Sequence, residues 1–103
     1  MEKEFNELKL FLSEFWSYNI TKIKEEYSLD DLGMYGDDKR DFLKAFFEKF
    51  DIDSEDMNYE KFCEPEIFNP LSFIFKKMKN EKIKIPINHL VSVIKKRKWF
   101  DPT

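Results

Sequence analysis

Five large apolar side chains recur at helical spacing in the middle of the chain, and they constrain its fold more than any other feature. They are Phe42, Leu43, Phe46, Phe47 and Phe50. Positions three and four apart share one face of an α-helix, so this row predicts a helix with a continuous apolar face. Asp37 and Asp38 come just before the row and can cap the helix, while Lys49 suits the negative end of its dipole.

Two further segments show the helical period and are expected to cover this face. One runs from Lys3 to about Trp16, and the other is capped by Asn88 and ends in the basic run 95–98. Their inward side chains are expected to be Leu8, Leu12 and Phe15 in the first helix, and Leu90, Val91 and Ile94 in the last. The sequence thus predicts a helical core centred on the Phe row.

The segments between these helices carry weaker signals. Residues 17–35 lack a sustained period and predict a long ordered loop, and residues 59–62 predict one short helical turn. Residues 68–78 predict another helix, with Pro70 at its first position, and residues 83–87 alternate like an extended strand. Trp99 and Phe100 are expected to fold back on the core.

Length and composition fit one small domain. The chain has 103 residues, only 2 Gly and 4 Pro, and 38% charged residues, a balance that favours helices over a turn-rich β fold. Its one cysteine cannot form an internal disulfide, the first residues lack the basic-then-apolar pattern of a signal peptide, and no apolar run has the length of a bilayer span. We expect a single all-α domain, cytoplasmic and monomeric, without a membrane role.

Charge is distributed unevenly along the chain. Residues 1–75 hold 19 acidic and 9 basic side chains, whereas residues 76–103 hold 2 acidic and 9 basic. Either the two regions pack together and neutralise each other, or they form an acidic docking face and a basic edge. The basic edge, Lys95 to Trp99, could contact phosphates and stack on bases, but four cations in an acidic protein are also typical of a solvated helix end.

Residue patterns for chemistry are incomplete. The run Asp51, Asp53, Glu55 begins like a calcium loop, but Asp56 and Phe62 replace its glycine and its final glutamate. His89 and Cys63 are too few for a zinc site, and a Cys–His nucleophilic pair would place its thiol beside acidic neighbours that raise the thiol pKa. The sequence therefore predicts no catalytic residue, no metal site and no cofactor.

The segment from Ser28 to Asp53 resembles the central motif of acyl carrier proteins. It reads Ser-Leu-Asp-Asp-Leu-Gly-Met-Tyr-Gly-Asp-Asp over residues 28–38, and then enters the Phe-rich helix, which ends Phe-Asp-Ile-Asp. The Leu-Gly-x-x-Gly-Asp-Asp block at residues 32–38 is closer still to a small bacterial family described only as an acyl-carrier-like domain of unknown function. The resemblance implies an acyl-carrier-protein-like four-helix bundle with an extra helical or extended insertion, residues 68–84, before the last helix.

The resemblance also implies that the carrier chemistry is missing. The serine that bears phosphopantetheine in that family falls on Gly36, which has no hydroxyl, and Ser28 aligns with a structural serine expected to cap the next turn. The hypothesis is a non-enzymatic module that binds a protein of unknown identity through the corner of the Phe-rich helix. The corner residues are Gly36, Asp37, Asp38, Arg40 and Asp41. The alternatives are an acyl carrier protein modified at a non-standard serine, and a small enzyme or nucleic-acid binder.

Overall fold

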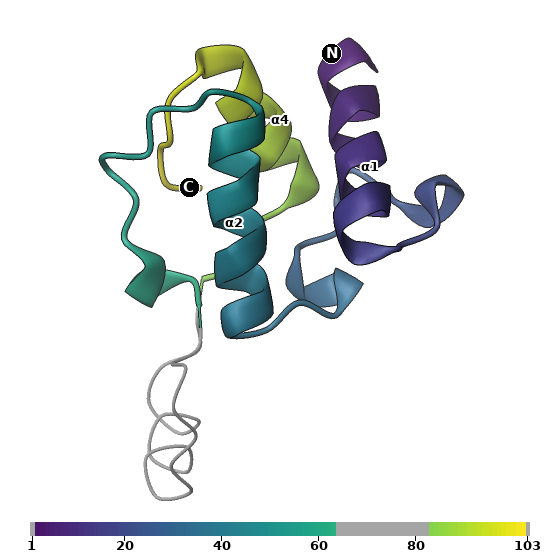
Figure 1. The fold of residues 1–103 in the computed structure, drawn as a ribbon, viewed down its shortest axis with the longest axis horizontal. Helices are drawn as coiled ribbons and strands as arrows, with labels where there is room; N and C mark the ends of the chain where they lie inside the picture. Colours follow the sequence, from purple (N-terminus) through teal and green to yellow (C-terminus); the bar gives the residue numbers. More distant parts are fainter. Residues whose placement is uncertain (1, 64–82, 103) are drawn as a thin grey trace, which may run out of the picture.

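Three α-helices pack around an aromatic core in the computed structural model, which describes residues 2–63 and 83–102 (Figure 1). They are α1 (Glu2–Trp16), α2 (Asp37–Lys49) and α4 (Ile87–Lys96). Single 3-10 turns lie between them: η1 (Ile20–Lys22), η2 (Asp30–Leu32) and η3 (Tyr59–Lys61). The described residues form no sheet, only two isolated bridges, Ser28 with Pro86 and Asp53 with Lys98. The all-α prediction is confirmed for this part of the chain.

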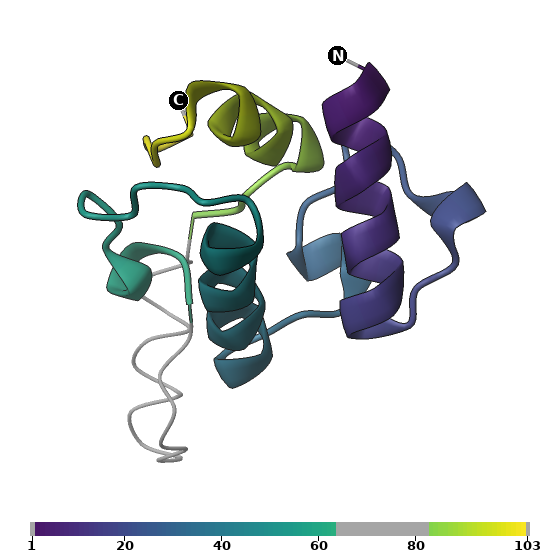
Figure 2. The ribbon, with the colours of Figure 1, turned by 45° about the horizontal axis from the view of Figure 1, so that its top comes forward.

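The Phe-rich helix, α2, occupies the middle of the molecule. Figure 1 shows α1 on one side of it and α4 behind it, and Figure 2, with the top brought forward, shows α4 above the upper end of α2. Between Ser17 and Gly36 the chain is mostly loop, interrupted by η1 and η2, which agrees with the predicted long loop. No helix within residues 2–63 and 83–102 is long and apolar enough to cross a membrane.

The predicted core is confirmed with one correction. All five side chains of the Phe row are buried, and so are Leu8, Leu12, Leu90, Val91 and Ile94. Phe15 is different, because 38% of it is exposed. It lies in the last turn of α1, where its ring meets the Phe42 ring edge-on at 5.5 Å and keeps its other side in solvent.

The chain after α4 folds back as predicted and forms a C-terminal strap, residues 97–102. Trp99 is only 1% exposed and packs its ring edge-on against Phe47 and Phe62. The strap is held by backbone hydrogen bonds, 3.0 Å from Asp53 N to Arg97 O and 2.8 Å from Trp99 N to Asp53 O. The strap thus joins the end of the chain to the loop after α2.

Two predicted features near the last helix need correction. The helix begins at Ile87 with Pro86 as its cap residue, so Asn88 lies inside the first turn and does not cap it. The extended alternation holds only in part, because Ile85 and Ile87 are buried whereas Ile83 is exposed and no strand forms. The helix predicted at 68–78 and most of the insertion predicted at 68–84 lie outside the described residues, so the four-helix bundle stays a prediction.

Candidate functional site

The turn that opens α2 is built on the backbone freedom of Gly36. Its φ is 56° and its ψ is −120°, the geometry of the first central residue of a type II′ turn. The turn closes with a 3.1 Å hydrogen bond from Asp38 N to Tyr35 O, and the Gly36 carbonyl accepts the first helical bond from Arg40 N at 3.1 Å. Gly36 therefore serves this turn through its backbone. A β-carbon at this φ would be strained.

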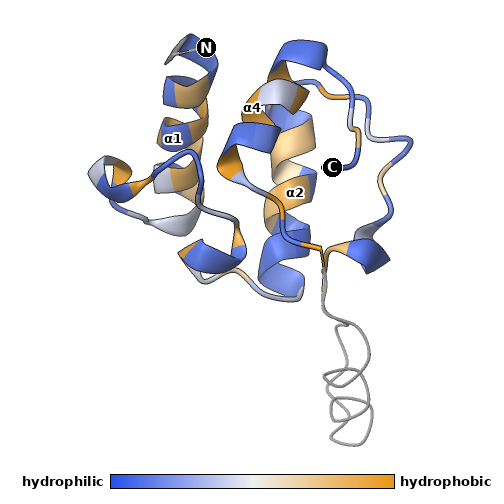
Figure 3. Ribbon diagram, turned by 180° about the vertical axis from the view of Figure 1, so that it is seen from behind, coloured by the Kyte–Doolittle hydropathy of each residue, from blue (hydrophilic) through white to orange (hydrophobic). Residues whose placement is uncertain are grey.

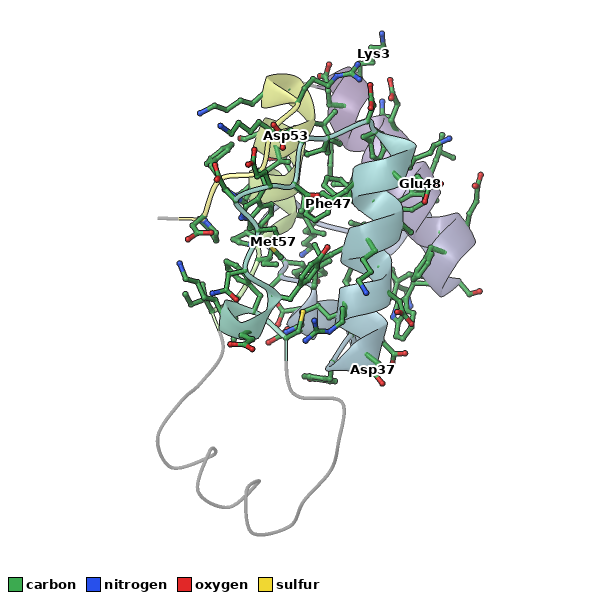
Figure 4. The ribbon with its side chains drawn as sticks, turned by 60° about the vertical axis from the view of Figure 1, so that its left-hand side comes forward. Lys3, Asp37, Phe47, Glu48, Asp53 and Met57 are labelled. Atoms are coloured by element: carbon green, nitrogen blue, oxygen red, sulfur yellow. The ribbon has the colours of Figure 1, made fainter. Side chains whose placement is uncertain are left out.

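No side chain caps α2, which corrects the prediction for Asp37 and Asp38. Gly36 holds the cap position, and both aspartates lie in the first helical turn. There they favour the positive end of the helix dipole without capping a backbone N–H group. Asp37 lies at the outer end of α2 and points away from the core, unlike Phe47 (Figure 4). The first turns of α2 are accordingly hydrophilic (Figure 3).

Lys39 turns inward from this corner, and sequence reasoning did not find it. Only 1% of it is exposed, its ammonium forms an ion pair with Asp30, and it donates a 2.8 Å hydrogen bond to the Phe62 carbonyl. The signal was present in the sequence, because Lys39 precedes Phe42 and Leu43 by three and four residues and so shares their helical face. Its charge is neutralised inside the molecule and is removed from the surface of α2.

Arg40 and Lys44, also on α2, both lie against one aromatic ring. The Tyr59 ring centre is 5.3 Å from the Arg40 guanidinium and 5.9 Å from the Lys44 ammonium. Burial raises the pKa of the Tyr59 phenol, with a further contribution from Cys63, while Arg40 acts in the other direction. Arg40, the one cation among the predicted partner-binding residues, is thus directed toward η3.

The side chains left on the outer surface of the corner are acidic and aromatic. Asp37, Asp38 and Asp41 are all exposed, and none forms an ion pair with a described residue. Tyr35, just before the turn, is 57% exposed. The corner therefore combines a rigid backbone turn with three carboxylates that face solvent.

Ser28 has a structural role, as predicted. Its hydroxyl accepts a 3.2 Å hydrogen bond from Asp31 N, and the Asp31 carboxylate accepts a 2.9 Å bond from Ser28 N. This reciprocal arrangement is a capping box, and the backbone hydrogen bond from Ser28 is the main cause that lowers the pKa of Asp31. Ser28 is also buried.

The acidic loop after α2 is organised by its own backbone. Asp51 adopts a left-handed φ of 52°, and the Asp53 carboxylate accepts a 3.0 Å hydrogen bond from Glu55 N.

Cys63 is buried, while a His89 ring nitrogen lies 2.6 Å from the Phe100 carbonyl. Within residues 2–63 and 83–102, no three His, Cys, Asp or Glu side chains gather in a way that could hold a metal ion.

The basic C-terminal run is largely used within the fold. Arg97 donates a 3.1 Å hydrogen bond to the Phe50 carbonyl at the end of α2, and Lys98 pairs with Asp56 at 3.5 Å. Lys96 lies over the Phe100 ring, and Trp99 is buried and cannot stack on a base. A shallow depression of about 350 Å³ beside this run is lined by Asp56, Lys96, Lys98, Trp99, Phe100 and Asp101. Its charges are balanced, so it has no preference for an anion.

The fold and the site define a small helical domain in which the carboxylates of Asp37, Asp38 and Asp41 face solvent at the start of α2. The chain belongs to the family described as "Protein of unknown function (DUF1493)", whose family model matches residues 3–101. No curated protein and no solved structure matches the chain.

Proposed function

We propose that this domain is a non-enzymatic, acyl-carrier-protein-like interaction module that carries no phosphopantetheine and binds a protein partner through the α2 corner. The observation that carries the proposal is the set of three exposed carboxylates on the first turns of α2: Asp37, Asp38 and Asp41. Since Lys39 is withdrawn and Arg40 is directed toward Tyr59, no cation among the described residues of the corner offsets them.

The way other charges are used supports this proposal. Arg97 binds the end of α2, Lys98 pairs with Asp56, and Lys61 pairs with Asp101 at 3.0 Å. Of these contacts, only the Lys98–Asp56 pair joins the basic end of the chain to the acidic region, because Lys61 and Asp101 carry the minority charge of their own regions. Unpaired negative charge at the α2 corner can steer a basic surface into contact and disfavour an acidic one.

A comparison of three immobilised proteins tests the corner. The wild type, the double variant Asp37→Lys with Asp41→Lys, and the control Glu25→Lys with Glu26→Lys are exposed to lysate of the native host. The control reverses two exposed charges on the loop before η2. We expect one protein to be retained by the wild type and the control and lost from the corner variant. Identical retention on all three would refute the corner as the binding site.

The absence of a prosthetic group is tested separately. The acyl-carrier resemblance places the attachment position at Gly36, where no hydroxyl exists and where φ opposes any other residue. Incubation with coenzyme A and a broad-specificity phosphopantetheinyl transferase should leave the intact mass unchanged. Gly36→Ser should be modified poorly, and Gly36→Ser with Asp37→Leu better, since the second change removes a charge beside the incoming phosphate.

Stoichiometric addition to the wild type would instead favour the alternative, a carrier modified at a non-standard serine. Ser28 is disfavoured for that role, because its hydroxyl is buried and accepts a hydrogen bond from Asp31 N. Mapping the modified peptide by mass spectrometry would identify the serine.

A further inference from the structure

Aromatic rings bridge the space between α1 and α2. The Phe11 ring lies 5.5 Å from Phe42 and 5.9 Å from Phe50, and the Phe15 ring lies 5.5 Å from Phe42. The backbone of α1 approaches α4 more closely than it approaches α2, so bulky rings make this contact. We call Phe11, Phe15 and Phe42 the aromatic seam.

The α1 side of this seam is open to solvent. Phe42 is fully buried, but Phe11 is half-buried and Phe15 is the one Phe among the described residues that is classed as exposed. On the α2 side, Ala45 follows Phe42 by three residues and is itself half-exposed. The seam therefore presents aromatic surface beside a small side chain, a combination that suits an inserted apolar residue of a partner.

Carboxylates border the seam on both helices. Glu7 and Glu14 lie four residues before and three residues after Phe11, and so flank it on α1. Asp38 and Asp41 lie four residues and one residue before Phe42, on the α2 margin. All four carboxylates are exposed and none has an ion pair among the described residues, while Lys49, seven residues after Phe42, brings one cation to the far end of the margin.

We propose that the aromatic seam docks an amphipathic helix with basic flanks, supplied by the protein partner. The inference rests on the proposed function, because it assumes a protein partner and names its chemistry. Apolar residues spaced three and four apart would cover Phe11 and Phe15, and Lys or Arg on both sides of that stripe would meet the two acidic margins. The seam thus extends the contact from the α2 corner onto α1.

Charge argues against two other occupants. A second copy related by twofold symmetry would place acidic margins against acidic margins, which costs free energy. An anionic lipid surface would be repelled by the same carboxylates. Sedimentation of the free protein measures self-association, and binding to phosphatidylserine vesicles measures the interaction with an anionic lipid surface.

The probe is a designed peptide of about 18 residues, long enough for several helical turns, with Leu at helical spacing and Lys on both flanks. Two matched peptides serve as controls: one with the same composition in scrambled order, and one with Glu in place of Lys. Amide and side-chain NMR shifts of the full-length, isotope-labelled protein report where each peptide binds. We expect saturable shifts at Phe11, Phe15 and Ala45 with the first peptide alone, weakening as salt is added.

Variants on α1 separate the seam from the corner. Glu7→Lys with Glu14→Lys changes exposed side chains only and should weaken peptide binding by about tenfold or more. Phe15→Ser should weaken it comparably, whereas Ile83→Ser, at an exposed apolar side chain outside the seam and the corner, should not. The seam is refuted if the scrambled peptide binds equally, if the shifts map elsewhere, or if the free protein self-associates or binds the vesicles through these residues.

The same α1 variant, used as bait in the lysate comparison, distinguishes the two proposals. Loss of the partner from the corner variant together with full retention on Glu7→Lys with Glu14→Lys would keep the proposed function and overturn the seam. Loss from both variants supports both. Retention on both would overturn both.

Discussion

Gly36 adopts a conformation that other residues reach only with strain. A φ of 56° with a ψ of −120° lies outside the left-handed helical region, which Gly33 occupies at 88° and 13°. Gly36→Ala should therefore lower the free energy of unfolding by about 1 to 3 kcal/mol, and by more than Gly33→Ala does. Gly33 is a fair comparison, because a β-carbon there would meet no atom within 4 Å. Urea denaturation of both variants measures the two losses of unfolding free energy. A larger loss for Gly33→Ala than for Gly36→Ala would contradict the turn geometry.

Lys39 supplies a second test at the residue scale, because it carries a charge into the interior. Lys39→Met removes the ion pair with Asp30 and leaves that carboxylate and the Phe62 carbonyl without their donor. We expect a loss of about 1 to 3 kcal/mol, below the full cost of an unpaired buried charge, since Asp30 is partly exposed. Adding Asp30→Asn should restore part of the loss. A double-mutant cycle from chemical denaturation measures the coupling, and strictly additive losses would argue against the pair.

His89 makes stability depend on pH. Since a carbonyl oxygen only accepts, the ring nitrogen facing Phe100 O donates, and the other nitrogen has no hydrogen-bond partner among the described residues. Burial lowers the pKa of His89, while the bond to Phe100 and the charge of Asp101 oppose that shift. The unfolded chain, with a His pKa of about 6.5, therefore takes up the proton first, and this contribution to stability is lost as the pH falls through that range.

His89 is the one histidine in the sequence, so its ring proton resonances give an unambiguous NMR titration. We expect a midpoint below that of the unfolded protein. The free energy of unfolding should also fall more steeply between neutral and mildly acidic pH in the wild type than in His89→Gln, which keeps a donor but does not titrate. Equal slopes would show that His89 does not contribute.

The spacing of apolar side chains predicted the three helices α1, α2 and α4, and the structure confirms them. Phe46 lies at the centre of the row on α2, is fully buried and contacts the rings of Phe42, Phe47 and Phe50. Phe46→Ala should lower the free energy of unfolding by about 3 to 5 kcal/mol, through lost burial and the cavity left behind. Glu48→Ala, on the exposed face of the same helix, should change it by less than about 0.5 kcal/mol. Thermal and chemical denaturation of the two variants test the orientation of α2.

What spacing could not provide was the contacts made by helix ends and by long polar side chains. Which residue caps a helix depends on backbone angles that residue type only biases. The cap of α2 is therefore Gly36 instead of Asp37 or Asp38, and the cap of α4 is Pro86 instead of Asn88. Lys39 follows the apolar period, yet its partner Asp30 comes from a loop whose path the sequence does not reveal. The sequence therefore located the carboxylates at the start of α2 but not the direction of Lys39 and Arg40, and the corner stays a prediction as a binding site.

At the scale of the whole molecule, the two halves of the charge pattern meet where the chain closes on itself. The C-terminal strap brings Lys98 of the basic run to Asp56 of the acidic region, while a second pair, Asp101 with Lys61, joins the minority charges of the two regions. Two of the four cations predicted as a possible nucleic-acid edge, Arg97 and Lys98, thus hold the strap in place. Trp99, expected to pack on the core, does so between η3 and α4, where it contacts Phe62 and His89. Sequence spacing indicated that Trp99 packs inward but not which elements it joins.

Because Trp99 is part of the core, the core cannot be completed until the last residues of this chain have been synthesised. Phe47 is made early, but the Trp99 ring that covers it comes about fifty residues later. At translation speeds of about 5 to 20 residues per second, roughly 2 to 10 s pass before that cover exists. For this interval Phe47 lacks the ring that covers it in the finished domain, whereas Phe42 and Phe50 can already be covered by Phe11 of α1.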